Sequence, residues 1–294
     1  MSDPVSSADV VFDFDAAARL IAKCNSAVSL VGSLSAGRRL DVVIGMTDFK
    51  GYFSQVFSDN AAMETTDAKN LTTCLRGVAK AVQFLVDSAK AENAQRKKAR
   101  EWDARRAEKW AVEKGWDDLW NLDQRPPSTT GTPAPQAPAA PTLQTRSNPS
   151  TGSTASGGTS SARPDKLRTF ASNTTTRNNE LITILVGLRA ADVAFQAGCG
   201  WGSLNATSVW NAFQTYIDAN INDTKWAKTL ANAFDVAGGE GDLSTAADSA
   251  LAAALQGAGV KTTRDGLTIT PAQVQGMPLT SGFCDDPVNA ATGG

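Results

Sequence analysis

Apolar residues near the start of the chain recur with the spacing of an amphipathic helix. Phe14, Ile21 and Val28 repeat every seven residues, and smaller apolar side chains fill positions between them. A seven-residue repeat is typical of a helix that packs along another helix. Asp13 or Asp15 is a suitable N-cap, because an Asp side chain accepts hydrogen bonds from the first free N–H groups. The pattern therefore predicts a long helix that begins at these residues.

A second helix of the same kind is predicted to begin near Tyr52. Beyond Ala89 it becomes charged, and Glu92 and Arg96 stand at i, i+4, where ion pairs form on a helix surface. The two apolar stripes can face each other, so we expect an antiparallel helical hairpin. The apolar positions of the second stripe are Phe53, Val56, Phe57, Met63, Leu71, Leu75, Val78, Val82 and Leu85.

The turn Phe49-Lys50-Gly51-Tyr52 separates the two helices. Glycine permits a positive φ and a close approach of the backbone to the facing helix, and the neighbouring aromatic ring can plug the open end of the helix pair. Two helices cannot cover an apolar stripe from all sides, so the hairpin needs further helices from another chain or from this one. A simpler alternative is that Phe49 and Gly51 only end one helix and start the next.

Residues 123–165 interrupt the helical pattern. They hold eight of the twelve prolines and are rich in Ser, Thr, Gly and Ala. A segment of this composition cannot bury enough apolar surface to order itself, so we expect a flexible tether. Two more amphipathic segments follow, separated by a second aromatic–glycine turn at Trp201-Gly202.

These elements predict an all-α fold of two antiparallel helical hairpins with four-helix-bundle-like packing, joined by a disordered linker. The expected parts are a hairpin with a charged extension in 1–122, the linker in 123–165, a second helical domain in 166–280 and a short terminal segment in 281–294. There is no run of about 18 apolar residues, so we expect no stable membrane span.

Charge and composition exclude several functions. Lys and Arg number 28 against 30 Asp and Glu, and the basic cluster between Arg96 and Lys109 is interleaved with acidic residues. We interpret this cluster as an ion-paired exposed helix rather than a nucleic-acid surface. The chain has no histidine, which removes Ser-His-Asp and Cys-His arrangements. We therefore expect no enzyme activity, no cofactor and no metal.

The cysteines, Cys24, Cys74, Cys199 and Cys284, are widely spaced and form no C-x-x-C pair, which argues against a zinc or thioredoxin-like site. They can be small buried side chains. Alternatively, Cys24 can form a disulfide with Cys74, since the two lie at comparable distances on either side of the first turn. Pairing requires a specific Cα separation, which the sequence does not give.

The first hairpin resembles a known family. Phe49-x-Gly51, Phe57 and the stripe that follows are similar to the Trp-x-Gly helical-hairpin proteins exported by type VII (ESX) secretion, with Phe49 where that family usually has Trp. The resemblance covers roughly residues 10–115 and implies a helical bundle with small helical-hairpin partner proteins and contact with the secretion machinery. The family's Tyr-x-x-x-Asp/Glu element has no counterpart, because Phe84 is followed four residues on by Ser88. Targeting would then use a partner's signal or lie elsewhere.

The last residues carry a second resemblance. Asp286-Pro287-Val288-Asn289, followed by Ala-Ala-Thr-Gly, is similar to the segment that opens the Rhs/YD-repeat shell of polymorphic toxins. It implies that these residues belong to the N-terminal part of a larger secreted toxin. The alternative is a proline turn and glycine tail without functional meaning.

The sequence thus predicts a non-catalytic docking region of a secreted toxin. Its start has no basic and apolar signal-peptide regions, so we expect cytoplasmic residence before export and secretion without a cleaved signal peptide. Three tryptophans before the linker either cap the hairpin or anchor a partner. The alternative function is a self-contained structural or virion-associated helical protein that oligomerises through its hairpins. The expected partner-binding residues are Phe49, Gly51, Tyr52, Phe57, Leu71, Leu75, Val78, Val82, Trp110, Trp116 and Trp120.

Overall fold

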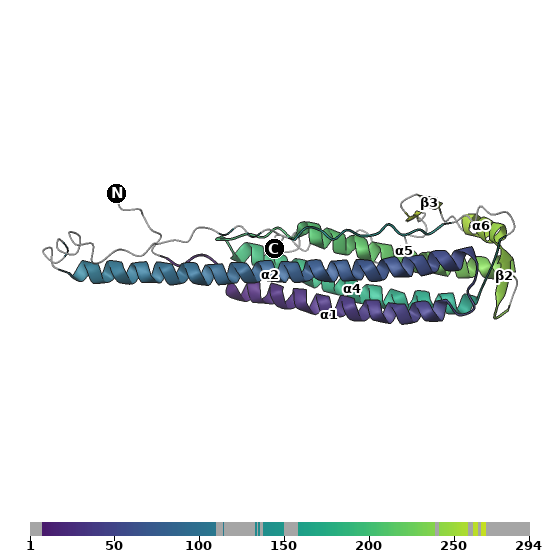
Figure 1. Cartoon of the computed structure of the whole chain (residues 1–294), viewed down its shortest axis with the longest axis horizontal. Helices are drawn as coiled ribbons and strands as arrows, with labels where there is room; N and C mark the ends of the chain where they lie inside the picture. The colour runs from purple at the N-terminus through teal and green to yellow at the C-terminus, as the bar shows by residue number, and fades with distance from the viewer. Residues whose placement is uncertain are drawn as a thin grey trace, which may run out of the picture. The chain divides into compact units, whose positions relative to one another are not determined.

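The computed structural model describes residues 8–109, 114, 133, 135, 138–149, 158–238, 241–257, 261–263 and 266–268. In this part of the chain the fold is all-α, as the hydrophobic pattern predicts (Figure 1). The helices are α1 (Phe14–Gly45), α2 (Tyr52–Glu108), α4 (Pro164–Gly198), α5 (Thr207–Gly238) and α6 (Asp248–Gly257).

Short strands complete the described secondary structure. β1 (Thr159–Ala162) pairs antiparallel with β2 (Ser244–Ala247), with Thr159 opposite Ala247. β3 (Lys261–Thr263) pairs in the same way with β4 (Gly266–Thr268).

The start of α1 confirms the predicted N-cap. Oδ1 of Asp13 accepts hydrogen bonds from the N–H groups of Asp15 at 2.9 Å and Ala16 at 2.8 Å. These are N–H groups that have no partner within the helix, so the side chain of Asp13 satisfies them. Pro164 begins α4, where its fixed φ and missing N–H suit the first helical position.

The chain divides into two compact units, and each contains segments from both halves of the sequence. This division differs from the expected succession of one hairpin domain after another, because α1, α2, α4 and α5 each contribute to both units. Packing of the two complete hairpins as a four-helix bundle stays a prediction. Unit 1 comprises Met1–Gly32, Lys69–Pro141 and Leu181–Gln214, and unit 2 comprises Ser33–Ala68, Thr142–Glu180 and Thr215–Gly294.

The buried residues of unit 1 include aliphatic side chains of α1, α2 and α4 and the aromatic rings of Phe12 and Phe195. The ring of Phe12 lies 6.2 Å from that of Phe195 in α4, in an edge-on arrangement. The N–H of Asp13 donates to the carbonyl of Gly198 at 3.0 Å, which ties the start of α1 to the end of α4.

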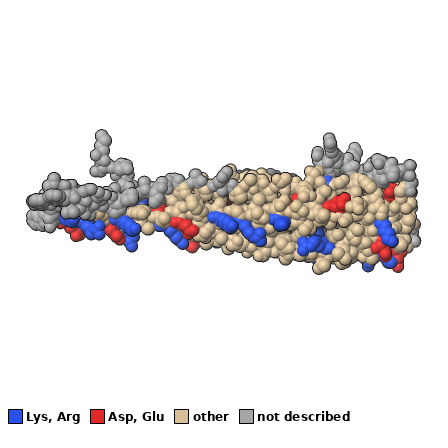
Figure 2. All heavy atoms as spheres, in the orientation of Figure 1, with Lys and Arg blue, Asp and Glu red and all other residues tan. Residues whose placement is uncertain are grey.

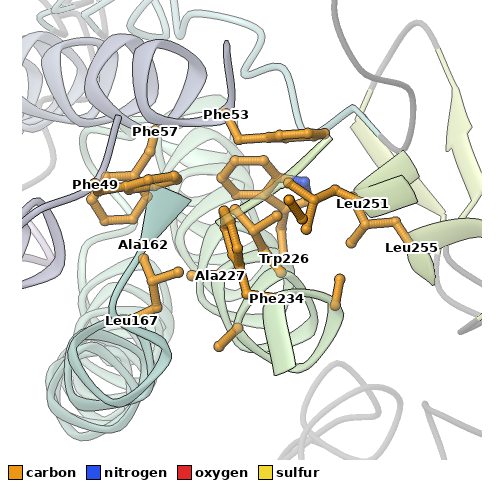
Figure 3. Packing of buried hydrophobic residues seen from close by; sticks show 14 of the residues in the cluster. Phe49, Phe53, Phe57, Ala162, Leu167, Trp226, Ala227, Phe234, Leu251 and Leu255 are labelled. Carbon is orange, nitrogen blue, oxygen red and sulfur yellow. The ribbon is translucent and has the colours of Figure 1, made fainter. Parts of the chain in front are cut away.

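Unit 2 has an aromatic core to which α2, α4, α5, α6 and both strands of the first sheet contribute (Figure 3). Partly buried residues of α1, among them Val42, pack against it. Burial of one such large apolar side chain contributes about 1.5–3 kcal/mol. The buried members are Phe49, Phe53, Phe57, Ala162, Leu167, Phe170, Trp226, Ala227, Leu230, Ala231, Ala233, Phe234, Ala246, Leu251 and Leu255.

The prediction of a free tether over 123–165 is wrong for residues 142–149, which form an extended segment packed within unit 2. Arg146 and Asn148 in this segment are only 5% and 3% exposed. Composition predicted disorder because the segment has few bulky apolar residues, but buried hydrogen bonds and ion pairs hold it instead. The same predicted linker also contains β1. Residues 123–132 and 150–157 lie outside the described part of the chain.

Candidate functional site

The turn between α1 and α2 is fixed by its backbone. The N–H of Lys50 donates to the carbonyl of Ser161 at 2.8 Å, and the N–H of Ser161 donates to the carbonyl of Lys50 at 3.1 Å. Gly51 has a φ of 92°. A Cβ at this position would lie 2.4 Å from Oγ of Ser160 and 2.5 Å from the carbonyl oxygen of Thr159. Both the φ and the close approach therefore require glycine.

Phe49 points into the core of unit 2 rather than outward (Figure 3). Its ring centroid lies 5.9 Å from that of Phe57 and 6.0 Å from that of Phe234. Tyr52 is partly buried against the same core, with its ring 5.2 Å from Phe53. Phe49 and Phe57 are each 4% exposed, so they do not form an exposed docking surface.

The four seam residues of α2, Leu71, Leu75, Val78 and Val82, are core residues of unit 1, each 0% exposed. A partner that docked on them would have to displace the chain's own core. Their expected role in partner binding stays a prediction, and it would require this core to open.

The second turn, Trp201-Gly202, separates α4 from α5 as expected and lies within unit 1. The N–H of Trp201 donates to the carbonyl of Val11 at 3.2 Å. Gly202 is buried, and a Cβ on it would lie 2.8 Å from a methyl group of Leu85. This glycine lets the turn approach α2 closely.

Three of the expected partner-binding residues, Trp110, Trp116 and Trp120, lie outside the described residues. The toxin-like string of residues 282–293 also lies outside them.

The Cys24–Cys74 disulfide is absent: Cys24, Cys74 and Cys199 are free thiols. The two side chains face different surroundings, because Cys24 is fully buried whereas Sγ of Cys74 donates to the carbonyl of Ala139 at 3.4 Å. Burial, together with the charge of Asp192, raises the pKa of Cys24 to about 12. This thiol therefore stays protonated and unreactive at neutral pH. Cys284 lies outside the described residues.

Sequence reasoning missed a cluster of polar residues in the core of unit 2. Asn60, Glu64 and Asp67 continue the three- and four-residue spacing of the α2 stripe and are 4%, 1% and 1% exposed. Polar residues at core positions of a helix are the signal that points to such a cluster. We call it the buried polar cluster; its members are Ser35, Arg38, Asn60, Glu64, Asp67, Arg146, Asn148, Tyr216, Asn220 and Asp223.

Asp223 of α5 stands at the centre of the cluster. Its Oδ2 accepts hydrogen bonds from Nη2 of Arg38 at 2.9 Å and from Nη1 of Arg146 at 2.6 Å. Its Oδ1 accepts weaker bonds from the side-chain amides of Asn148 at 3.3 Å and Asn60 at 3.4 Å. Four segments of the chain, namely α1, α2, α5 and residues 142–149, thus meet at one carboxylate.

Glu64 forms the second acidic centre. Its Oε2 accepts from Oγ of Ser35 at 3.1 Å, and its Oε1 accepts from the hydroxyl of Tyr216 at 2.5 Å. Burial, and next the charge of Glu64, raises the pKa of Tyr216. The phenol therefore stays protonated and acts as a hydrogen-bond donor.

Asp67 is an acidic group of the cluster whose pKa is shifted by its surroundings. Burial raises the pKa of its carboxyl, although a hydrogen bond from the Gln144 N–H and the charge of Arg146 act in the opposite direction. Burial also lowers the pKa of Arg146, but the charge and hydrogen bond of Asp223 more than offset this, so the pKa of Arg146 is raised overall. Arg146 therefore stays charged.

A buried cluster of this kind specifies an arrangement more than it adds stability. Removing charged groups from water costs several kcal/mol for each ion, which hydrogen bonds and ion pairs then offset. A wrong register of the helices would leave Asp223, Arg38 or Arg146 buried without a partner. We interpret the cluster as the feature that fixes the register of α1, α2 and α5 within unit 2.

The described residues contain a small cavity but no cluster of metal ligands. Among them, no group of three or more His, Cys, Asp or Glu side chains is placed to hold a metal ion. A cavity of about 10 Å³ borders Arg38 and Trp226, which is space for about one water molecule. Two atoms of Arg38 beside it, Nε and Nη1, have no hydrogen-bond partner within the described residues.

No family model matches this chain, and no curated protein or solved structure matches it either.

The charged end of α2 carries side chains of both signs (Figure 2). Nε of Arg96 lies 2.9 Å from Oε1 of Glu92, which confirms one i, i+4 pair expected from the sequence. Nη2 of Arg100 lies 2.8 Å from Oδ1 of Asp9. This pairing agrees with an ion-paired helix rather than a continuous basic surface.

One described helix, α4, is long and apolar enough to cross a membrane by length and composition. The sequence expectation of no stable membrane span stays a prediction. Core helices of soluble proteins share this length and composition, and 22% of the apolar window of α4 is buried. Leu181, Leu185 and Leu188 of this helix are at most 2% exposed, and they pack inside unit 1.

Proposed function

We propose that this chain is a non-catalytic docking region of a secreted polymorphic toxin, recognised by small helical partner proteins for type VII-like export. The observation that carries the proposal is the Phe49-Lys50-Gly51 turn between two long helices, α1 and α2. An aromatic–glycine turn between two such helices is what the Trp-x-Gly resemblance implies. The toxin part of the proposal rests on the Asp286-Pro287-Val288-Asn289 string.

Burial of the α2 seam bears on where we propose that a partner binds. Leu71, Leu75, Val78 and Val82 are covered by the chain itself, so a partner is not needed to complete the core. We therefore propose recognition on the outer surface of the folded chain, where Gly51 of the turn is exposed and Phe49 anchors the turn in the core.

The second candidate function is a self-contained structural or virion-associated helical protein. Burial of the α2 seam within the chain favours it, because a chain that covers its own apolar stripe is stable without a partner. The two candidates differ in whether a small helical protein binds.

Co-expression distinguishes them. The chain would be produced alone and together with any small helical-hairpin proteins encoded beside it. The molar mass of each product would be measured by size-exclusion chromatography with light scattering. A stable complex of defined stoichiometry supports the docking region. A chain that elutes at the same mass with and without these proteins contradicts it.

A further inference from the structure

Residues 144–149 lie in unit 2 as an extended peptide between helices, and side chains of α2 and α5 hold its main chain. Nδ2 of Asn60 donates to the carbonyl of Ser147 at 2.7 Å, and Oδ1 of Asn60 accepts from the N–H of Ser147 at 3.0 Å. Oδ1 of Asp67 accepts from the N–H of Gln144 at 2.9 Å. Nε1 of Trp226 donates to the carbonyl of Pro149 at 3.1 Å. These contacts fix an extended backbone whatever its side chains are.

The side chain of Arg146 supplies specificity. It enters a pocket formed by Asp67, Asn220, Asp223 and Tyr216 and is 3% exposed. Nη1 donates both to Asn220 at 2.5 Å and to Asp223 at 2.6 Å. Nη2 lies 3.6 Å from Oδ2 of Asp67, and the guanidinium carbon lies 5.9 Å from the centroid of the Tyr216 ring.

This pocket suits arginine rather than lysine. Asn220 and Asp223 accept from Nη1, the carboxylate of Asp67 lies on the Nη2 side, and an aromatic ring lies within cation–π distance. Nε and Nη2 of Arg146 have no hydrogen-bond partner within the described residues. A lysine ammonium carries its charge on one atom and cannot reach both Asp67 and Asp223 in the same way. Asn148, two residues on, donates to Asp223 as well, so the sequence Arg-Ser-Asn matches the groove.

We propose that this groove is a peptide-binding site for an extended segment with a central arginine, and that residues 144–149 are its ligand held in cis. None of the contacts depends on the covalent link between the peptide and the groove. The link only raises the effective concentration of the peptide. A peptide of the same chemistry, including this segment from a second copy of the chain, binds when the cis segment is absent. Peptide binding in this groove does not depend on whether the chain is exported.

The test separates the peptide from the groove. Residues 142–149 are replaced by a Gly-Ser segment of equal length, and a fluorescent peptide, Thr-Leu-Gln-Thr-Arg-Ser-Asn-Pro, is titrated while its anisotropy is measured. The expected result is saturable binding, about tenfold or more weaker for a peptide with Lys in place of Arg and about a hundredfold or more weaker with Ala. The unaltered chain should not bind, because its own segment fills the groove. Absence of binding to the folded variant, or equal binding of the three peptides, overturns the proposal.

Neighbouring residues of α2 provide the matched control. Asn60→Ala in the variant background should weaken binding about tenfold or more, since it removes both main-chain contacts to Ser147. Asp59→Ala, at an exposed position, should leave binding unchanged. Equal effects of the two substitutions contradict recognition in this groove.

A second variant keeps the test decisive if the replaced chain does not fold. Arg146→Ala leaves the rest of the segment in place and empties only the arginine pocket. N-acetyl-arginine amide should raise its Tm, or restore its helical circular dichroism, whereas N-acetyl-lysine amide at the same concentration should not. The unaltered chain should respond to neither. Equal responses to both compounds, or no response to either, overturn the arginine pocket.

Discussion

The side chain of Asn60 binds both main-chain groups of Ser147, with distances of 2.7 Å and 3.0 Å. In an antiparallel sheet, the main-chain N–H and C=O of one residue form the same pair of hydrogen bonds with the residue opposite it. A helix residue thus takes the place of a strand and orders a segment that has few apolar side chains. The consequence is that the structure of unit 2 depends on polar contacts at Asn60, Arg146 and Asp223.

Truncation of Arg146 should therefore be strongly destabilising. Arg146→Ala leaves Asp223 with one of its two arginine partners and removes a bond to Asn220. Breaking a buried ion pair in this way costs about 3–5 kcal/mol. Urea unfolding followed by circular dichroism measures the change.

The matched control is Arg168→Ala. This arginine pairs with Asp235 at the surface and its side chain is 40% exposed, so its loss should cost about 1 kcal/mol or less. Equal losses in the free energy of unfolding from the two substitutions would contradict the larger contribution that we expect from the buried ion pair.

Two glycines of the first hairpin should respond in opposite directions to alanine. Gly51→Ala forces a side chain into a positive φ and against the backbone of Thr159, which should destabilise by roughly 1–3 kcal/mol. A Cβ added at Gly32 would have no neighbouring atom within 4 Å. Gly32→Ala should therefore stabilise α1 by about 0.5–1 kcal/mol, because alanine favours a helix. The midpoints of thermal unfolding give both signs, and destabilisation by Gly32→Ala contradicts the description of α1.

The raised pKa of Asp67 predicts a specific pH dependence. A carboxyl whose pKa is higher in the folded state contributes stability below its unfolded pKa, about 3.9, and this contribution is lost as the pH rises through the folded value. Asp67→Asn removes the titration and keeps an oxygen for the Gln144 N–H. The stability of this variant relative to the unaltered chain should therefore increase as the pH rises above about 4. The free energy of unfolding of both proteins, measured from about pH 4 to about pH 8, tests this prediction. A difference between the two proteins that does not change with pH contradicts it.

Thiol labelling should distinguish the cysteines. With Cys284 replaced by serine, Cys74 is half-buried while Cys24 and Cys199 are buried. A thiol reagent under native conditions should modify Cys74 first and Cys24 last, because burial holds the pKa of Cys24 at about 12. Intact mass should correspond to free thiols. Resistance of both Cys24 and Cys74, with a mass lower by two hydrogens, would indicate the disulfide that the structure lacks.

The helices of this fold are predictable from the sequence, because seven-residue apolar spacing and the Asp13 cap are local signals. The turn at Gly51 is also predictable as a turn. The positive φ of Gly51 is expected from the sequence, but its close neighbours are Thr159 and Ser160 of β1 rather than a facing helix. That neighbour is not predictable, because β1 is distant in sequence.

The buried polar cluster is harder to predict for a physical reason. Asn60, Glu64 and Asp67 lie at core positions of α2, but Asp, Glu and Asn side chains are mostly exposed unless buried partners pair with them. Their burial depends on Arg146, and composition assigns that residue to a flexible linker. The sequence of α2 does not predict that Arg146 is buried, and the sequence around Arg146 does not predict that Asn60, Glu64 and Asp67 are buried.

The most direct test of the proposed function is export of the chain itself. Its amount in the culture medium would be measured in a host with a working type VII-like system and in the same host without it, each with and without the neighbouring small helical proteins. The proposal predicts export only when both the system and a helical partner are present, and loss of export with Gly51→Ala even where the chain remains soluble. Export that is equal in all four strains, or absent from all of them, contradicts it.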